Sequence, residues 1–406
     1  MADFAGDDLS GSRFERVSLR DAQFRASDLR GTRFHAVWLH QVVMRGVELV
    51  DVDIHGEIAD VTINGVEVSG YVEAELDRRH PDRARMRPTD VAGFREAWDI
   101  LERLWAGTVE RARALDPARL HDSVGGEWSF IETLRHLVFA TDAWLRRAVL
   151  GDPAPWDLLG LPWDEMPDTP GIPRDRQARP ELETVLALRR DRMAGVRRFL
   201  DGLTEETLAG HTEPVEGPGW PESRSYPVRE CLQTVLGEEW EHRLYAERDL
   251  DALFRESGRL VHATRLIAAP AETVFELIAT PAEQPRWDGN DNLAGAVTGR
   301  RVRAIGDVFA MTTTKGNIRE NHIVEFAEGR RIAWRPAEPD RTPPGHLWRW
   351  ELEPVGPART RVTHTYDWSQ LTDAQRIPRA QATTAERLRA SLDRLADLAE
   401  HRPHAA

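Results

Sequence analysis

The sequence predicts a multidomain chain in which a repeat solenoid, an all-α domain and an α+β domain follow one another. Apolar residues recur every five positions at the start of the chain, apolar stripes with helical spacing fill the middle, and alternating apolar and polar residues appear near the end. Each period is typical of a different backbone conformation, because side chains of a helix return to the same face after about 3.6 residues and those of a strand after about two. We expect the three domains at residues 1–84, 85–254 and 257–406.

Composition narrows the classes of function. The 406 residues carry a net charge of −14, whereas phosphate binding needs a concentrated basic face, so nucleic acid is not an expected partner. The sequence has no run of about 18 apolar residues and its beginning is charged throughout, so we expect neither a membrane span nor a signal peptide. A single cysteine excludes an internal disulfide and fits a reducing compartment. We therefore expect a cytoplasmic protein.

The first domain is an internal repeat of five residues that places apolar side chains at strict intervals from Phe4 to Ile54. Neither a helix nor a flat strand has this period, whereas a parallel solenoid stacks short repeats around one core. The segment up to about residue 57 resembles the pentapeptide-repeat family, which implies a short right-handed parallel β-helix. Some longer members of that family imitate DNA through an acidic surface. Residues 1–54 carry nine acidic and seven arginine side chains, so we expect a structural or protein-binding role instead.

The second domain contains four helical stretches, of which the first two have clear starts. The first begins near Thr89 or Asp90, either of which can cap a helix. The second begins at Ser129, because Ser129 and Glu132 have the spacing of a capping box, and it continues to Leu150.

The other two helical stretches follow long loops. The third runs from about Pro180 to Leu203, and the fourth begins at Pro227, a residue favoured in a first helical turn. The proline-rich loop 152–180 is too long for a simple turn and is expected to cover a site, and a second loop spans 211–224. Four helices with two long connections predict a four-helix bundle.

Three side chains of the second domain have the chemistry of metal ligands. Glu238 and His242 lie four residues apart on the fourth stretch and therefore share one helix face, and His136 lies on the second stretch. Such a set can hold a divalent metal and leave one coordination position open, as catalytic zinc sites do. Glu239 is an alternative to Glu238, because three-residue spacing also faces His242. A packed histidine and a helical charge pair are the alternatives without a metal.

The helices and these three residues resemble the DinB superfamily, in the branch that contains mycothiol-dependent maleylpyruvate isomerase. The resemblance rests on His136 and on Glu238 and His242 within Glu-Glu-Trp-Glu-His. It implies a bound divalent metal, zinc in that branch, and a low-molecular-weight thiol such as mycothiol as cosubstrate. The implied reaction transfers the thiol to an electrophilic small molecule, or uses the thiol to isomerise it. No catalytic side chain beyond the metal ligands is predicted.

The third domain changes to strand-like alternation and ends in a helix. A strand at Leu260–Ile267 and a short helix at Pro270–Ala279 come first, and a long helix runs from Thr372 to about His401. Between them we expect strands at about 308–314, 317–326, 331–335, 347–352 and 361–368. A long helix gripped by a curved antiparallel sheet is an α+β arrangement.

This domain resembles the START-like, or helix-grip, superfamily, which includes the SRPBCC proteins and polyketide cyclases. The matching segments are residues 269–278 and Pro285-Arg-Trp-Asp288. The resemblance implies that a hydrophobic small molecule binds between the sheet and the final helix. An alternative function is therefore a non-catalytic small-molecule-binding or scaffold protein. The candidate ligand-binding residues are Trp287, Met311, Trp334, Trp348, Trp350, His364 and Tyr366.

Overall fold

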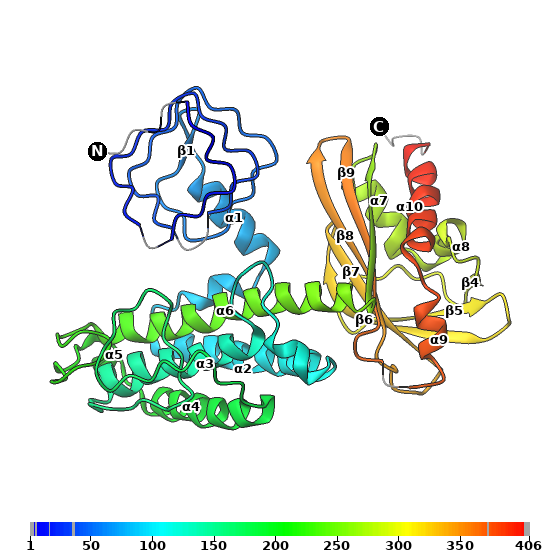
Figure 1. Ribbon diagram of the computed structural model, residues 1–406. Coiled ribbons are helices and arrows are strands. Elements are labelled where there is room, and N and C mark those ends of the chain that lie inside the picture. Colours follow the sequence, from blue (N-terminus) through cyan, green and yellow to red (C-terminus); the bar gives the residue numbers. More distant parts are fainter. Residues whose placement is uncertain (1–3, 5, 16, 35–36, 372, 402–406) are drawn as a thin grey trace.

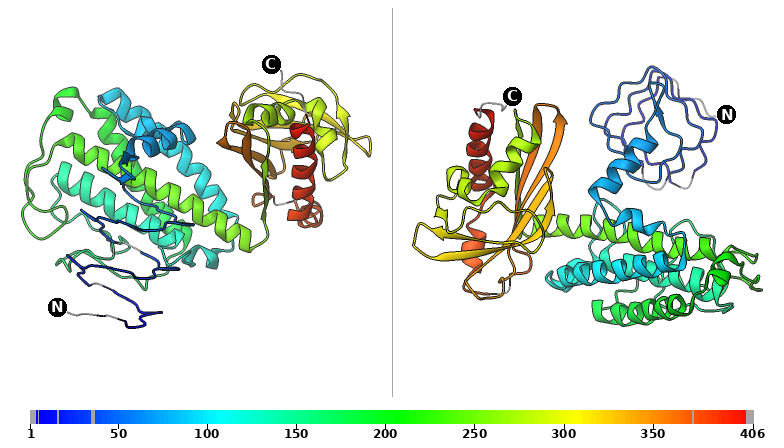
Figure 2. Two further views of the ribbon diagram at one scale, coloured as in Figure 1. Left: turned by 90° about the horizontal axis from the view of Figure 1, so that it is seen from above. Right: turned by 180° about the vertical axis from the view of Figure 1, so that it is seen from behind.

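The computed structural model describes residues 1–406 apart from 1–3, 5, 16, 35–36, 372 and 402–406. The repeat segment, the helical domain and the sheet domain are separate in space, and the long helix α6 connects the last two (Figure 1). Figure 2 shows the same three-part arrangement from above and from behind. Among the described residues, no helix has the length and apolar character needed to cross a membrane.

The repeat segment winds in coils that lie one upon another (Figure 1). The described residues between 4 and 57 form turns and bends but no β-strand. The apolar side chains of the repeat do not fill a shared core, because their exposed fractions range from 42% at Leu9 to 73% at Ile54. A β-helix therefore stays a prediction from the repeat.

A short hairpin and a helix join the repeats to the helical domain. Strands β1 (Thr62–Ile63) and β2 (Val66–Glu67) pair antiparallel directly after the repeats. Helix α1 (Ser69–Arg79), which the sequence did not predict, follows, and then the short helix η1 (Arg83–Met86). Arg83 donates hydrogen bonds to Glu73 and Asp77 of α1 and so fixes the angle between the two helices.

Four long helices pack alongside one another in the second domain (Figure 2). They are α2 (Val91–Arg113), α3 (Phe130–Thr141) with its π-helical continuation η3 (Asp142–Val149), α4 (Leu182–Gly202) and α6 (Val228–Glu256). Helix α3 contacts α4 and α6, and α2 contacts the same two helices. The short helices η2 (Pro117–His121) and α5 (Glu205–Ala209) lie in the connections.

The helix starts agree with the capping residues predicted from the sequence. The side chain of Asp90 accepts a hydrogen bond from the Gly93 amide at the start of α2. Ser129 and Glu132 make both bonds of a capping box at the start of α3, and Pro227 precedes α6. These starts fix which residues of α3 and α6 face each other, and therefore position the site described below.

The third domain is an antiparallel sheet that packs against two helices. Helices α7 (Ala271–Ala279) and α10 (Ala385–Glu400) cover one face, and Leu388, Leu392 and Leu395 of α10 lie in the apolar core. This is the helix-grip arrangement expected from the sequence. The strand order is β3 (Leu260–Ile267), β9 (Arg359–Asp367), β8 (Leu347–Gly356), β7 (Arg331–Ala337), β6 (Ile318–Ala327), β5 (Val308–Thr313) and β4 (Leu293–Ala296).

The end of the third domain differs from the prediction. The expected single helix from Thr372 to His401 is wrong, because α9 (Ile377–Gln381) ends before α10 begins at Ala385. Thr372 itself lies outside the described residues. Pro378 stands in the first turn of α9, where a proline ring is tolerated. Helix α9 ends at Gln381, and residues 382–384 separate it from α10. The short helices η4 (Pro281–Glu283) and α8 (Gln284–Trp287) and strand β4 were also not predicted.

Helix α6 leads almost directly into the third domain. Only Ser257, Gly258 and Arg259 separate its end from β3. Leu260, the first residue of β3, packs in an apolar cluster with helical-domain residues such as Phe254, and Arg259 donates a hydrogen bond to the Ala114 carbonyl. The junction is therefore packed and hydrogen-bonded.

Candidate metal centre

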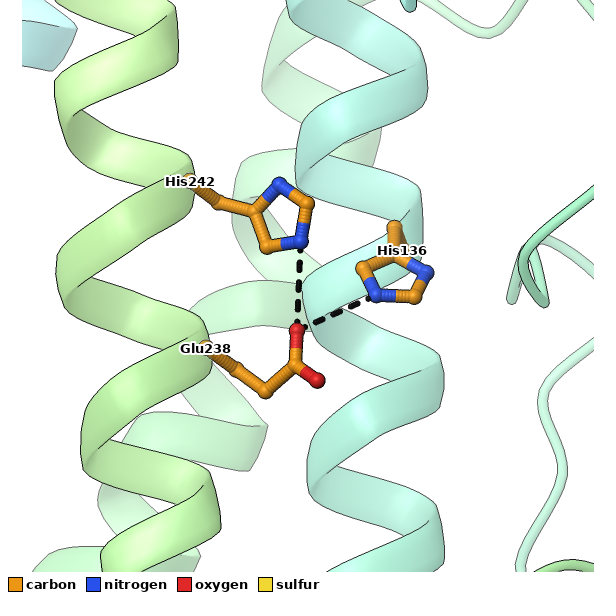
Figure 3. Close-up of side chains that lie close together, drawn as sticks. All are labelled: His136, Glu238 and His242. Atoms are coloured by element: carbon orange, nitrogen blue, oxygen red, sulfur yellow. Dashed lines mark hydrogen bonds and ion pairs between the residues drawn. The ribbon is translucent and has the colours of Figure 1, made fainter. Parts of the chain in front are cut away.

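His136, Glu238 and His242 meet between α3 and α6 (Figure 3). One ligand atom from each lies within 4.8 Å of the others. Glu238 Oε2 lies 3.2 Å from His136 Nε2 and 3.1 Å from His242 Nε2. Two ligands of one tetrahedral zinc ion lie about 3.3 Å apart, given metal–ligand bonds of about 2.0–2.1 Å. The two imidazole–carboxylate separations therefore already suit a shared ion, and the two imidazole nitrogens lie within 4.8 Å of each other.

The three side chains lie at the edge of the helical core. His136 is buried, whereas Glu238 and His242 are half-buried and keep solvent-accessible surface. Solvent therefore has an approach to Glu238 and His242, whereas His136 is enclosed. Tyr245 stands one turn after His242 with its ring edge-on to the imidazole, at 5.8 Å between centroids, and borders the same approach.

The orientation of His136 is set by a backbone carbonyl. Its Nδ1 lies 3.0 Å from the Leu161 carbonyl oxygen, which can only accept, so Nδ1 carries the proton. A neutral His136 then presents the lone pair of Nε2 to Glu238 Oε2. Two lone pairs facing each other at 3.2 Å repel unless a proton or a metal ion lies between them. The donor set thus fits a cation at its centre.

Burial and hydrogen bonding set the protonation states of the other two ligands. Burial acts to raise the pKa of Glu238, but the hydrogen bonds that His136 and His242 donate in their protonated forms outweigh it, and the pKa lies below its ordinary value. Burial lowers the pKa of His242, against the opposing hydrogen bond with Glu238. An ionised carboxylate and a neutral imidazole are the forms that bind metal ions.

Glu239, the alternative to Glu238, points elsewhere. Its carboxylate accepts two hydrogen bonds from the Arg189 guanidinium of α4, at 2.5 and 2.7 Å, and both side chains are buried. A carboxylate held by a buried guanidinium has little freedom to turn toward His242. Glu238 therefore lies beside the two histidines, whereas Glu239 forms an ion pair between α6 and α4.

Trp128 covers the imidazoles and connects them to the long loop. Its ring lies 4.6 Å from that of His136 and 5.8 Å from that of His242, nearly parallel to the latter. The indole N–H donates to Asp164 of the loop 152–180, and Asp164 also pairs with Arg176. The loop therefore contacts the site, as its length predicted.

Sequence reasoning did not identify Trp128 or the Leu161 carbonyl as parts of the site. Trp128 directly precedes the capping box of α3, a position where apolar residues often pack locally, and nothing in its spacing relates it to α6. A carbonyl acceptor has no sequence signal at all. Both become recognisable only when the loop is placed against α3.

The predicted ligand-binding residues of the third domain lie in its packed core. Trp287, Met311, Trp334, Trp350, His364 and Tyr366 are buried, and Trp348 is half-buried. The ring of Trp350 stacks on His364 at 3.7 Å and meets Trp287 edge-on at 5.0 Å, while Trp348 lies 4.3 Å from Tyr366. Burial lowers the pKa of His364 to about 3. Ligand binding by these residues stays a prediction.

The fold and the cluster of His136, Glu238 and His242 define a multidomain protein with a candidate metal centre in its helical domain. Models of protein families divide the chain in the same way. Residues 8–46 match pentapeptide repeats in eight copies, residues 100–246 match the DinB superfamily, and residues 259–400 match the family "Polyketide cyclase / dehydrase and lipid transport". The chain thus combines a segment of pentapeptide repeats, a helical domain that matches the DinB superfamily and a sheet domain that matches a START-like family.

Curated relatives cover a small part of the chain. "Uncharacterized protein Rv0088" of Mycobacterium tuberculosis (strain ATCC 25618 / H37Rv) is 26% identical over an alignment of 113 residues, with 25% of this chain and 44% of the relative covered. "Uncharacterized protein MT0096" of the strain CDC 1551 / Oshkosh matches to the same extent. The chain therefore spans less than half the length of these relatives.

Several solved structures are similar to about a third of the chain. Protein CV1439 from Chromobacterium violaceum is 18% identical, with 36% of this chain and 99% of that chain covered and a TM-score of 0.27. Protein MLL2253 from Mesorhizobium loti is 16% identical, with the same coverage and a TM-score of 0.29. A START superfamily protein from Mycobacterium smegmatis is 20% identical, with 35% and 97% covered and a TM-score of 0.27.

Proposed function

We propose that the helical domain is a metal-dependent enzyme that transfers a low-molecular-weight thiol to an electrophilic small molecule, or uses the thiol to isomerise that molecule. The proposal is supported above all by the meeting of His136, Glu238 and His242 at a point that keeps access to solvent. Two imidazoles and one carboxylate are a donor set that suits zinc and leaves a coordination position open.

Each residue of the site has a definite task in this proposal. A bound divalent ion would favour the thiolate form of the thiol, which is the nucleophile. His136 and His242 supply neutral nitrogen donors, and Glu238 supplies negative charge that offsets the ion. The Leu161 carbonyl keeps His136 in the correct tautomer and orientation. Trp128 shields the faces of the two imidazoles from water.

The finer features of the proposal come from the resemblance. We treat residues 85–254 as one four-helix bundle of the DinB type, preceded by a right-handed β-helix and linker at 1–84. The branch with mycothiol-dependent maleylpyruvate isomerase suggests a mycothiol-like thiol. The helix-grip domain at 257–406 would bind a hydrophobic small molecule, and the repeats would bind a protein partner.

Metal analysis with matched variants tests the proposal. We expect about one zinc ion per purified chain, zinc-free protein for His242→Ala, and wild-type content for His211→Ala, which removes an exposed histidine of the same domain. Thiol consumption with a panel of electrophiles should stop when a chelator is added and return with zinc. Chelator-insensitive consumption, or full zinc content in His242→Ala, would refute the proposed chemistry.

A non-catalytic small-molecule-binding protein is the second candidate. It is favoured by the Trp350 indole N–H and His364 Nδ1, which are buried side by side without a hydrogen-bond partner among the described residues. Leaving such groups unpaired costs about 1–3 kcal/mol each, and a ligand with a matching polar group would satisfy them. Under this alternative, purified protein contains no stoichiometric zinc, and ligand uptake changes in Trp350→Phe but not in His242→Ala.

A further inference from the structure

An aromatic wall stands beside the candidate metal centre; it consists of Phe139, Trp156, Trp163 and Trp220. Phe139 follows His136 by one turn of α3, and their rings lie 6.3 Å apart. Trp156 stacks on Phe139 at 5.3 Å, and Trp163 lies 6.3 Å from it. Trp163 meets Trp220 at 4.9 Å. The wall therefore extends from the metal-ligating turn of α3 across both long loops.

Two buried arginines hold these loops in place. Arg135 donates to the Leu159, Ala178 and Asp175 carbonyls of the loop 152–180, at 2.8, 3.2 and 2.5 Å. Arg147 donates to the Pro153 carbonyl of the same loop and to the Val215 and Gly217 carbonyls of the loop 211–224. All of these acceptors are backbone carbonyls, so the loop geometry depends on the arginines more than on loop side chains.

The approach of the second loop to Arg147 requires a glycine. A Cβ atom at Gly219 would lie 2.5 Å from the guanidinium carbon of Arg147. A larger residue at position 219 would push the Arg147 guanidinium away from its carbonyl partners. The wall is built in advance of any ligand, which lowers the entropic cost of binding.

The cationic groups around the wall are already engaged. Arg135 and Arg147 serve backbone carbonyls, as described above. In the loop 152–180, Arg174 pairs with Asp168, Arg176 pairs with Asp164, and Arg179 donates to the His121 carbonyl. An anionic substrate would have to displace one of these partners, and it would also approach the Glu238 carboxylate. The surroundings therefore favour an uncharged molecule.

Space for a small molecule borders the wall. A hollow of about 330 Å³, open to solvent on one side, is formed by the segment from Met166 to Arg174 of the loop 152–180. Met166, which lines this hollow, belongs to one apolar cluster with Phe139, and Ile172 of the hollow packs against that cluster, as Trp163 and Trp220 do. The volume is within the range of small-molecule sites, which begins at roughly 300 Å³.

We infer that the electrophile of the proposed reaction is an uncharged aromatic molecule whose ring packs on the aromatic wall, with Trp163 as the residue that determines specificity. This inference rests on the proposed function for the reaction, but the binding itself needs neither metal nor thiol. With a chloroarene as electrophile, the thiol sulfur forms a bond to the ring carbon. The carbon–chlorine bond breaks, chloride leaves with the electron pair, and the thiol proton passes to solvent.

Binding to zinc-free, thiol-free protein provides the first test. By equilibrium dialysis, 1,3-dinitrobenzene should bind about tenfold more tightly than 3,5-dinitrobenzoate, which adds a carboxylate to the same ring. Trp163→Ala should weaken 1,3-dinitrobenzene binding about tenfold, and Trp163→Phe should restore most of the affinity. Leu158→Ala, which changes a side chain of the same loop that is 79% exposed, should bind as wild type does.

The reactive counterparts provide the second test, with the zinc-loaded protein and a low-molecular-weight thiol. The chloroarene 1-chloro-2,4-dinitrobenzene should be preferred over 4-chloro-3,5-dinitrobenzoate, and Trp163→Ala should raise KM more than it lowers kcat. Equal binding of the neutral and the anionic ring, or unchanged binding in a folded Trp163→Ala variant, would overturn the inference. Selective arene binding without any thiol consumption would uphold the wall as a binding site and refute the proposed function instead.

Discussion

Replacement of Glu239 by glutamine separates the roles of two neighbouring carboxylates. In the folded chain, Glu239 is 1% exposed and Arg189 is 3% exposed, and two short hydrogen bonds join them. Removing one partner of such a pair leaves a buried charge uncompensated and typically costs about 3–5 kcal/mol. A glutamine keeps one hydrogen-bond acceptor for Arg189, so we expect a loss of about 3 kcal/mol in the free energy of unfolding.

The matched variant is Glu238→Gln. Glu238 is half-buried and its partners are the two histidines, so the zinc-free protein should lose no more than about 1 kcal/mol. The zinc content should follow the opposite order: Glu238→Gln should lose the ion, and Glu239→Gln should keep it. Urea unfolding in the presence of chelator, followed by far-UV circular dichroism, gives the stabilities, and elemental analysis gives the zinc content.

Two results would refute this reasoning. A Glu239→Gln protein that is folded but zinc-free would make Glu239 the ligand. Equal free energies of unfolding of the two variants in chelator would mean that the ion pair between Arg189 and Glu239 adds no net stability to the folded chain.

Three further predictions concern stability. Burial lowers the pKa of His364 to about 3, so between pH 6.5 and pH 3 this histidine is protonated in the unfolded chain but not in the folded one. The free energy of unfolding of the sheet domain should therefore be at its full value above pH 6.5 and fall by up to about 5 kcal/mol toward pH 3. His364→Phe should make this pH dependence flatter in urea unfolding. Gly289→Ala should lower the unfolding free energy by about 3 kcal/mol, since its Cβ would lie 2.3 Å from the Ser391 amide nitrogen of α10, whereas Gly299→Ala, with open space around it, should not. Ser129→Ala should cost about 1 kcal/mol by removing the capping box of α3, measured by thermal unfolding against Glu132→Gln, which can retain part of it.

The sequence predicted best where one local pattern decides the structure. Asp90 and Ser129 cap helices in the structure, because a cap needs only a side-chain oxygen that accepts a hydrogen bond from a backbone amide three residues later. Strand β3 was predicted with its observed bounds, since its alternation is bounded by a loop and a proline. Four-residue spacing placed Glu238 and His242 on one face of α6 for the same reason.

The sequence could not decide what depends on partners far along the chain. Nothing local distinguishes Glu238 from Glu239; the choice comes from Arg189, fifty positions earlier on α4. Strand β4 contains a glycine and has few residues, so its pairing with β5 has no alternation of its own to reveal it. The π-helical turn η3 continues a helical pattern and is indistinguishable from α-helix by apolar spacing.

Helix α6 has a consequence for how the two larger domains can cooperate. Fourteen residues of continuous helix separate His242 from Glu256, which corresponds to about 21 Å, and β3 starts four residues later. The packing of Leu260 against Phe254 and the hydrogen bond from Arg259 to the Ala114 carbonyl hold the two domains together at this junction. If the proposed reaction takes place at the helical site, a product that binds in the sheet domain has to cross this distance, and we expect added ligand to compete with it for the sheet domain.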